Sequence, residues 1–106
     1  MTALFDLEKG RRETLRWLIL YALYASRPLG AGELILLTYV REGIADVTPR
    51  ELRNELDYLA ERDLLHLDGR ESPQWRAKLT RYGTDITEYT IDCEPGIARP
   101  KKYWGD

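Results

Sequence analysis

The sequence has very few of the residues from which disulfides and metal sites are made. Among its 106 residues there is one cysteine, Cys93, and one histidine, His66. A disulfide within the chain needs two cysteines, and an ordinary zinc site needs several Cys, His or carboxylate ligands. We therefore expect neither a disulfide nor a metal centre, and a fold that is held together by packing.

Long apolar runs are missing as well. The most apolar segment, residues 15–25, is interrupted by Arg16. It is shorter than a bilayer span, which needs about 20 apolar residues. The N-terminus, Met-Thr-Ala-Leu-Phe-Asp, lacks the basic and apolar regions of a signal peptide. These two absences predict a cytoplasmic protein with no membrane partner.

An excess of positive charge is also absent, since the formal net charge is -2. A strong basic bias is typical of proteins that coat nucleic acid, so the sequence argues against that class. The charge is nevertheless uneven along the chain. Bases outnumber acids over residues 70–81 and again in the tail, at Arg70, Arg76, Lys78 and Arg81 and at Arg99, Lys101 and Lys102. These local basic segments are compatible with contacts to phosphate groups.

The residue patterns that catalysis needs are not found. The sequence has no Gly-rich phosphate loop, no nucleophile motif and no cluster of metal ligands. Asp85 and Glu88 are acids three positions apart, which is more typical of an exposed helix face than of an acid–base pair. His66 lies near Asp68, but a single histidine is more often a structural or surface residue than a general base. We expect that the protein is not an enzyme and that it uses no cofactor.

The clearest local pattern is a helix over residues 48–62. Thr48 is a suitable N-cap, Pro49 suits the first helical position, and Glu51 stands where a capping box places its carboxylate. Apolar residues recur at helical spacing on one side, and polar residues occupy the other side. The expected buried side is Leu52, Leu56 and Leu59, and the outer side is Arg50, Asn54, Asp57 and Glu61, with Arg53 on the flank.

Periodicity elsewhere predicts three more helices and a hairpin. We expect a first helix from Asp6 or Glu8 to about Ser26, and a second helix over residues 31–41 that is apolar all round and packed on all sides. Strands 64–68 and 74–79 flank a turn with Gly and Pro, and Thr80 caps a last helix that runs to about Tyr89. The expected fold is mainly α with a small β-hairpin, a winged helix-turn-helix over residues 1–92, followed by an extended C-terminal arm over residues 93–106.

The first helix is apolar on two sides. Its two stripes are Leu15, Leu18, Ile19, Ala22 and Leu23, and Trp17, Leu20, Tyr21 and Tyr24. A small domain has few elements with which to cover both stripes, so we expect a homodimer. Its expected interface is Trp17, Leu20, Tyr21 and Tyr24, with Tyr103 and Trp104 of the tail. The alternative is a central helix that is buried entirely within one chain.

Arginine and asparagine are side chains that pair bidentately with guanine and adenine edges. Arg50, Arg53 and Asn54 lie in the first two turns of the third helix, the part that usually enters a major groove. In the hairpin, alternation places Arg76 and Lys78 on the face away from the core. The predicted contacts with double-stranded DNA are Arg50, Arg53, Asn54, Arg70, Arg76 and Lys78. Asp57 and Glu61 oppose a deep approach, and the alternative is an ordinary solvated helix face.

Four motifs spread over nearly the whole chain resemble one family. They are Arg11-Arg12 before an apolar helix, the pattern Val47-Thr48, Leu52-Arg53, Glu55-Leu56, Tyr58-Leu59, Glu61 and Leu64, the step Leu79-Thr80-Arg81-Tyr82-Gly83, and the run Pro95-Gly96-Ile97-Ala98-Arg99-Pro100. Together they resemble small winged-helix proteins of Mu-like phages and prophages, some labelled as regulators of the arsenic-repressor type. Asp63 departs from the pattern, which has a glycine there as a left-handed cap. The resemblance implies a winged-helix fold, a phage origin and dimerisation, and it brings no established target.

Two hypotheses for function follow from these patterns. The first is a dimeric winged-helix protein that binds duplex DNA and regulates transcription in a phage or prophage. The second keeps the fold but uses it as an adaptor that binds a phage or host protein and no DNA. The capped third helix and the cationic hairpin favour the first, whereas the acidic balance and the doubled apolar face of the first helix favour the second.

Overall fold

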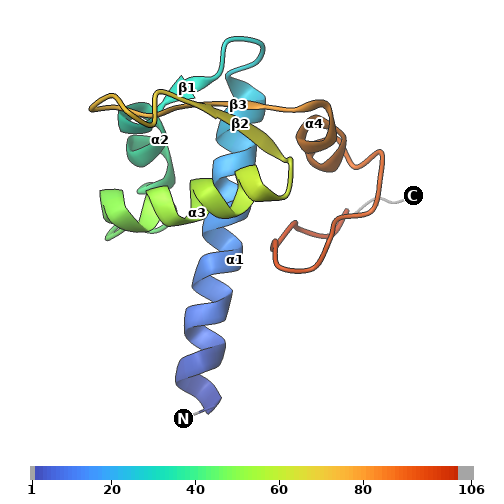
Figure 1. The fold of residues 1–106 in the computed structure, drawn as a ribbon. Coiled ribbons are helices and arrows are strands. Elements are labelled where there is room, and N and C mark those ends of the chain that lie inside the picture. Colours follow the sequence, from blue (N-terminus) through green and yellow to red (C-terminus); the bar gives the residue numbers. More distant parts are fainter. Residues whose placement is uncertain (1, 103–106) are drawn as a thin grey trace.

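The computed structural model describes residues 2–102 and consists of helices with a small antiparallel sheet, as expected (Figure 1). The order is α1 (Thr2–Ala25), β1 (Ala31–Gly32), α2 (Glu33–Val40), α3 (Pro49–Glu61), β2 (Leu65–Asp68), β3 (Arg76–Leu79) and α4 (Arg81–Thr87). The strand order in the sheet is β1-β3-β2. The long α1 passes behind α3, and the sheet lies across the end of α1 that is opposite its N-terminus (Figure 1).

The predicted hairpin forms, and a third strand joins it. Leu65 is paired with Leu79 and Leu67 with Ala77, so β2 and β3 bury their apolar residues on one face. Ala31 is paired with Ala77 on the other edge of β3. The prediction of a helix beginning at Ala31 is therefore wrong by two residues. The backbone N–H of Glu33 still donates to the carbonyl oxygen of Trp75 at 2.9 Å, so α2 begins where the strand pairing ends.

The third helix forms as its sequence predicts. The hydroxyl oxygen of Thr48 accepts a hydrogen bond from the backbone N–H of Glu51 at 3.1 Å, and Pro49 stands in the first turn. Leu52, Leu56 and Leu59 are completely or almost completely buried. The chain leaves the helix through Asp63, whose φ of 62° lies in the left-handed region. Asp63 thus adopts a backbone conformation that glycine adopts more readily than other residues.

The last helix is also capped as predicted, but it is shorter. The hydroxyl oxygen of Thr80 accepts a hydrogen bond from the backbone N–H of Gly83 at 3.0 Å. The helix ends at Thr87, and Tyr89 follows it with a positive φ. At Gly83 the helix lies against the backbone carbonyl of Leu64, where a Cβ atom would clash. A glycine in this helix is therefore required by close packing.

The first helix begins at Thr2, several residues before the predicted start. Its core-facing residues Leu15, Ile19 and Leu23 are fully buried. Leu20, predicted in a dimer interface, is 0% exposed and belongs to the core of the single chain. The assignment of Leu20 to the dimer interface was therefore wrong. α4 and the segment after it cover part of the second apolar stripe, and the sequence alone does not show that these elements pack there.

The aromatic residues of this second stripe have different surroundings. The ring of Trp17 lies edge-on to Tyr89, with 6.3 Å between ring centroids. The hydroxyl of Tyr24 donates to the carboxylate of Glu88 at 3.0 Å. Tyr21 is the member of the stripe that remains exposed. Tyr103 and Trp104, which were expected to complete the interface, lie outside the described residues.

The C-terminal arm has no helix or strand between residues 93 and 102, and it packs against the body of the protein. Ile97 is buried, and the backbone N–H of Ala98 donates to the carbonyl oxygen of Glu13 at 3.1 Å. The guanidinium of Arg99 donates to the carbonyl oxygens of Ile86 and Ile91. Within residues 2–102, no helix is long and apolar enough to cross a membrane.

A buried ion pair joins α1, α3 and this arm. The guanidinium of Arg16 donates to the carboxylate of Glu55 at 2.6 Å and to the carbonyl oxygen of Gly96 at 2.8 Å. It also stacks on the ring of Tyr58, 3.5 Å from the ring centroid. Both charged side chains are about nine-tenths buried. Each charge therefore needs the other to offset the cost of losing its hydration.

We expect Glu55→Ala to destabilise the fold by about 3–5 kcal/mol, because it leaves the buried charge of Arg16 uncompensated. Urea unfolding followed by circular dichroism measures the loss. The matched control is Asp85→Ala, which breaks the pair of the exposed Arg81 and the partly exposed Asp85 within α4. We expect that control to cost about 0.5 kcal/mol or less, and similar losses in the two variants would contradict the prediction.

Candidate functional site

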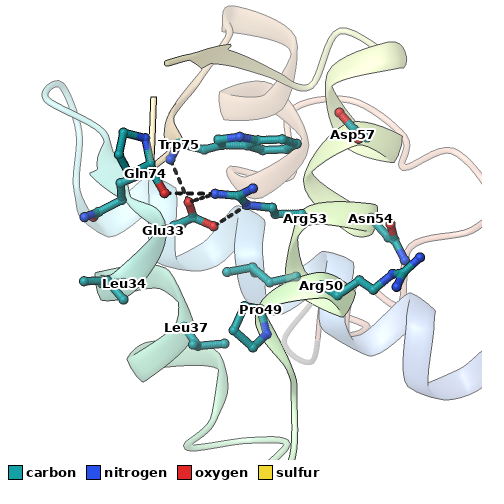
Figure 2. A pocket seen from close by; sticks show the side chains of 12 residues that line it. Glu33, Leu34, Leu37, Pro49, Arg50, Arg53, Asn54, Asp57, Gln74 and Trp75 are labelled. Atoms are coloured by element: carbon teal, nitrogen blue, oxygen red, sulfur yellow. Dashed lines mark hydrogen bonds and ion pairs between the residues drawn. The ribbon is translucent and has the colours of Figure 1, made fainter. Parts of the chain in front are cut away.

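A groove lies between α2, the outer flank of α3 and the residues just before β3. Its volume is about 600 Å³. The lining combines leucine, proline and tryptophan side chains with charged and amide groups (Figure 2). The lining residues are Glu33, Leu34, Leu37, Pro49, Arg50, Leu52, Arg53, Asn54, Asp57, Pro73, Gln74 and Trp75. Three of the predicted DNA contacts, all from α3, therefore lie together at one site.

An ion pair between α2 and α3 crosses this groove. The Nε of Arg53 donates to one carboxylate oxygen of Glu33 at 2.8 Å, and its Nη2 donates to the other oxygen. The backbone N–H of Trp75 also donates to this carboxylate, at 2.7 Å. Figure 2 shows Arg53 reaching Glu33 below the indole ring of Trp75, and the guanidinium carbon lies 4.5 Å from the ring centroid. These contacts fix the relative positions of α2, α3 and the hairpin.

The ion pair lowers the pKa of Glu33 below the ordinary value of a glutamate. The hydrogen bonds from Arg53 are the main cause, and the backbone N–H of Trp75 acts in the same direction. Burial opposes them, because it disfavours the charged carboxylate. The Nε and Nη2 groups of Arg53, one of the predicted DNA contacts, are thus engaged with Glu33 and with the carbonyl oxygen of Pro73.

Two acids of α3, Glu51 and Asp57, also pair with arginines. Arg11 of α1 binds the carboxylate of Glu51 with two hydrogen bonds of 2.7 and 2.9 Å. These hydrogen bonds lower the pKa of Glu51. Arg70 from the hairpin turn binds Asp57. Of the two acids expected to oppose DNA on the outer side of α3, Asp57 is thus paired with an arginine, whereas Glu61 remains exposed near the end of the helix.

Arg50 and Asn54 are the exposed polar residues of the first two turns of α3. They are one helical turn apart, so their side chains are neighbours on the same side of the helix. In Figure 2 they lie next to each other on the side of α3 away from α2, and no interaction joins them to the other side chains drawn. Their hydrogen-bond donors are open to solvent and available to a ligand.

The remaining predicted DNA contacts do not gather at this groove. Arg70 lies nearby but is paired with Asp57. Arg76 and Lys78 are exposed on the outer face of β3, as alternation predicts. There Arg76 donates to the carbonyl oxygen of Leu29, and Lys78 lies beside the turn at Arg27 and Pro28. The basic side chains of β3 therefore lie apart from those of α3. Sequence spacing alone does not reveal this separation.

Two apolar side chains beside the groove are exposed. Leu34 is 61% exposed and Ile35 is 65% exposed, on the outer side of α2. The expectation that this helix is packed on all sides is therefore wrong. Leu36, Leu37 and Val40 face the core, and no further element within residues 2–102 covers the opposite side. An exposed apolar surface of this kind is typical of a binding site for another molecule.

Groups that could carry other chemistry are isolated. Among residues 2–102, no three His, Cys, Asp or Glu side chains come together in a way that could hold a metal ion. Cys93 is partly buried in the C-terminal arm, and this burial raises the pKa of its thiol. A raised pKa makes the reactive thiolate rarer at neutral pH.

Comparison with known proteins identifies no relative of this chain. No protein-family model matches the sequence, and neither the curated proteins nor the solved structures contain a match. The function is therefore argued from the geometry of the chain itself.

Four residues of the groove were not predicted from the sequence as site residues. They are Glu33, Leu34, Leu37 and Trp75. The one signal for Glu33 was its place as an acid at the start of an otherwise apolar stretch.

The ion pair predicts a pH dependence of stability. Because the pKa of Glu33 is lower in the folded than in the unfolded chain, its contribution is complete above the unfolded pKa. This contribution is lost as the pH falls through the folded pKa, that is, from about pH 5 downward. We expect Glu33→Gln to be less stable at pH 7 by roughly 1–3 kcal/mol and to lose less stability on acidification.

Urea unfolding between pH 7 and pH 3 measures both effects. Glu71→Gln is the control, because Glu71 is exposed in the hairpin turn outside the groove. This control is expected to keep the pH dependence of the unsubstituted protein. An unchanged pH dependence in Glu33→Gln would show that the carboxylate of Glu33 is not stabilised in its charged form by folding.

Proposed function

We propose that this chain is a winged-helix protein of phage origin that binds duplex DNA and regulates transcription. The order of its elements supports this proposal, since two successive helices, α2 and α3, precede a hairpin whose second strand also pairs with β1. In helix-turn-helix proteins the second helix of such a pair enters the major groove. A fold of this class is used for many purposes, so the argument for DNA rests on the residues of α3.

The observation that carries the proposal is the placement of Arg50 and Asn54. Both are exposed on the first two turns of a helix whose N-terminus is capped by Thr48 and which begins at Pro49. Arginine reads the O6 and N7 atoms of guanine, and asparagine reads the N6 and N7 atoms of adenine. The partial positive charge at a helix N-terminus also favours the approach of phosphate groups.

The charge pairs of α3 favour the same approach. Arg11 and Arg70 compensate Glu51 and Asp57, so the surface around Arg50 is less acidic than the sequence of the helix indicates. Arg53 would position α3 through Glu33 and would not itself contact a base. As a homodimer the protein would read two half-sites if its two α3 helices lay on one face about 34 Å apart.

We expect the protein to bind a random-sequence duplex at low salt, with an affinity that falls steeply as salt is added. Arg50→Ala and Asn54→Ala together should weaken binding at least about tenfold, because each removes side-chain contacts to the DNA. Fluorescence anisotropy with a labelled duplex measures both effects. Selection from a random library would then identify a preferred site.

Lys101→Ala is the matched control, since it removes one exposed cation from the C-terminal arm, outside the groove. It should leave the affinity nearly unchanged. Absence of salt-dependent binding, or equal affinity of the Arg50→Ala, Asn54→Ala double variant and the control, would contradict the proposal. If Lys78→Ala lost affinity and the Arg50→Ala, Asn54→Ala double variant did not, the DNA-binding surface would be the outer face of β3 and not α3.

A second candidate is a winged-helix adaptor that binds a phage or host protein. The exposed Leu34 and Ile35 beside the groove favour it, because DNA has little apolar surface to cover them. This candidate predicts no salt-dependent affinity for DNA. It also predicts one copurifying protein that is lost in Leu34→Glu and retained in Leu29→Glu, a matched change in the exposed turn before β1.

A further inference from the structure

The N-terminal part of α1 extends beyond the body of the protein (Figure 1). Every side chain from residue 3 to residue 10 is exposed, and we call this segment the α1 extension. It carries three large apolar side chains, Leu4, Phe5 and Leu7, which are 58%, 64% and 71% exposed. Leu4 and Leu7 are three positions apart, so they lie on one side of the helix. An isolated helical segment of this length is only marginally stable in water, so its apolar side is a candidate contact surface.

The groove beside α2 and α3 has the complementary character. Leu34, Leu37, Pro49 and Trp75 provide its apolar lining. Its volume of about 600 Å³ leaves room for side chains of another molecule. Grooves of this kind bind one side of an amphipathic helix through apolar anchors that are three or four positions apart. Leu4 and Leu7 have this spacing.

Charge is complementary as well. The α1 extension contains Asp6 and Glu8 next to its leucines and one base, Lys9, so acids outnumber bases in it. Arg50 at the start of α3 lines the edge of the groove and is exposed, whereas the two acids of the lining, Glu33 and Asp57, are already bound by arginines. An acidic apolar helix would therefore meet an uncompensated cation and few uncompensated anions.

The α1 extension cannot fill the groove of its own chain. It is part of one continuous helix, Thr2–Ala25, whose second half is fixed in the core by Leu15, Ile19 and Leu23. The N-terminus points away from α2 and from the hairpin (Figure 1). Two complementary surfaces are thus carried on one rigid body that keeps them apart, and a contact between them has to join two molecules.

We propose that the groove binds the α1 extension of a second copy of this chain. Leu4 and Leu7 enter between α2 and α3, and the acids of the extension face Arg50. Reciprocal exchange of the two extensions closes a symmetric dimer, in which each copy provides one extension and one groove. This proposal does not rest on DNA binding, but it uses the same residue, Arg50, and it describes a dimer other than one whose two α3 helices read neighbouring half-sites. It also replaces the interface that the sequence predicted around Leu20.

Cysteine crosslinking tests the pairing directly in a Cys93→Ser background. Leu7→Cys places a thiol on the α1 extension, and Leu34→Cys places one at the groove. Mixing the two proteins under mild oxidation should give a disulfide-linked dimer that contains one copy of each. Each protein alone should give little or none, because two extensions, or two grooves, do not meet in the proposed dimer.

Sedimentation of variants without added cysteines provides an independent measurement. Leu7→Glu should raise the dissociation constant of the dimer at least about tenfold, because it places a charge in an apolar contact. Leu29→Glu is the matched control on an exposed turn outside both surfaces. It should leave the dissociation constant unchanged.

Three results would overturn the proposal. Crosslinking of Leu7→Cys with itself would show that the extensions pair with each other. Crosslinking of Leu34→Cys with itself would show that the grooves face each other. A monomeric mass of 12.4 kDa at all protein concentrations would show that no second copy binds.

Discussion

The position of α3 depends on pairs of arginine and carboxylate groups on both of its flanks. On one flank, α1 provides the arginines and α3 the acids. On the other flank, α2 provides an acid for an arginine of α3, and the hairpin turn provides an arginine for an acid. The pairs are Arg11 with Glu51, Arg16 with Glu55, Glu33 with Arg53, and Arg70 with Asp57. The pair of Arg16 and Glu55 is the most buried of them, and removal of one partner would strand a charge that water cannot reach.

Helical geometry determines which residues remain for function. Positions 51 and 55 form a row toward α1, positions 53 and 57 form a row toward the groove, and positions 52, 56 and 59 face the core. The row left to solvent contains Arg50 and Asn54. These two residues are available because each neighbouring row already has a partner. The helical period of α3 therefore determines both which of its residues stabilise the fold and which remain exposed.

Local features could be predicted from the sequence, whereas partners that are distant in the sequence could not. The caps at Thr48 and Thr80 and the leucines of α3 are encoded within a few residues, and all of them were predicted. The contacts of Trp17 with Tyr89 and of Tyr24 with Glu88 depend on where the chain returns after α4, and no local pattern encodes that path. The role of Arg53 depends on Glu33, 20 residues away, which becomes its partner only when β1 pairs with β3. The residues that α3 contributes to the candidate site could therefore be predicted from the sequence. Those of α2 and Trp75 could not.

Arg50 is common to both proposed interactions, and this has a consequence for regulation. A guanidinium that faces the acids of a second copy cannot at the same time contact a guanine or a phosphate group. The dimer formed by exchange of the α1 extensions would therefore be a form that does not bind DNA through α3, and the two ligands would compete. Since the extension is acidic and apolar while DNA is acidic and polar, salt would weaken the DNA complex more than the dimer. Protein concentration and ionic strength would then both shift the balance toward self-association, and the exposed Leu34 would be covered in that form alone.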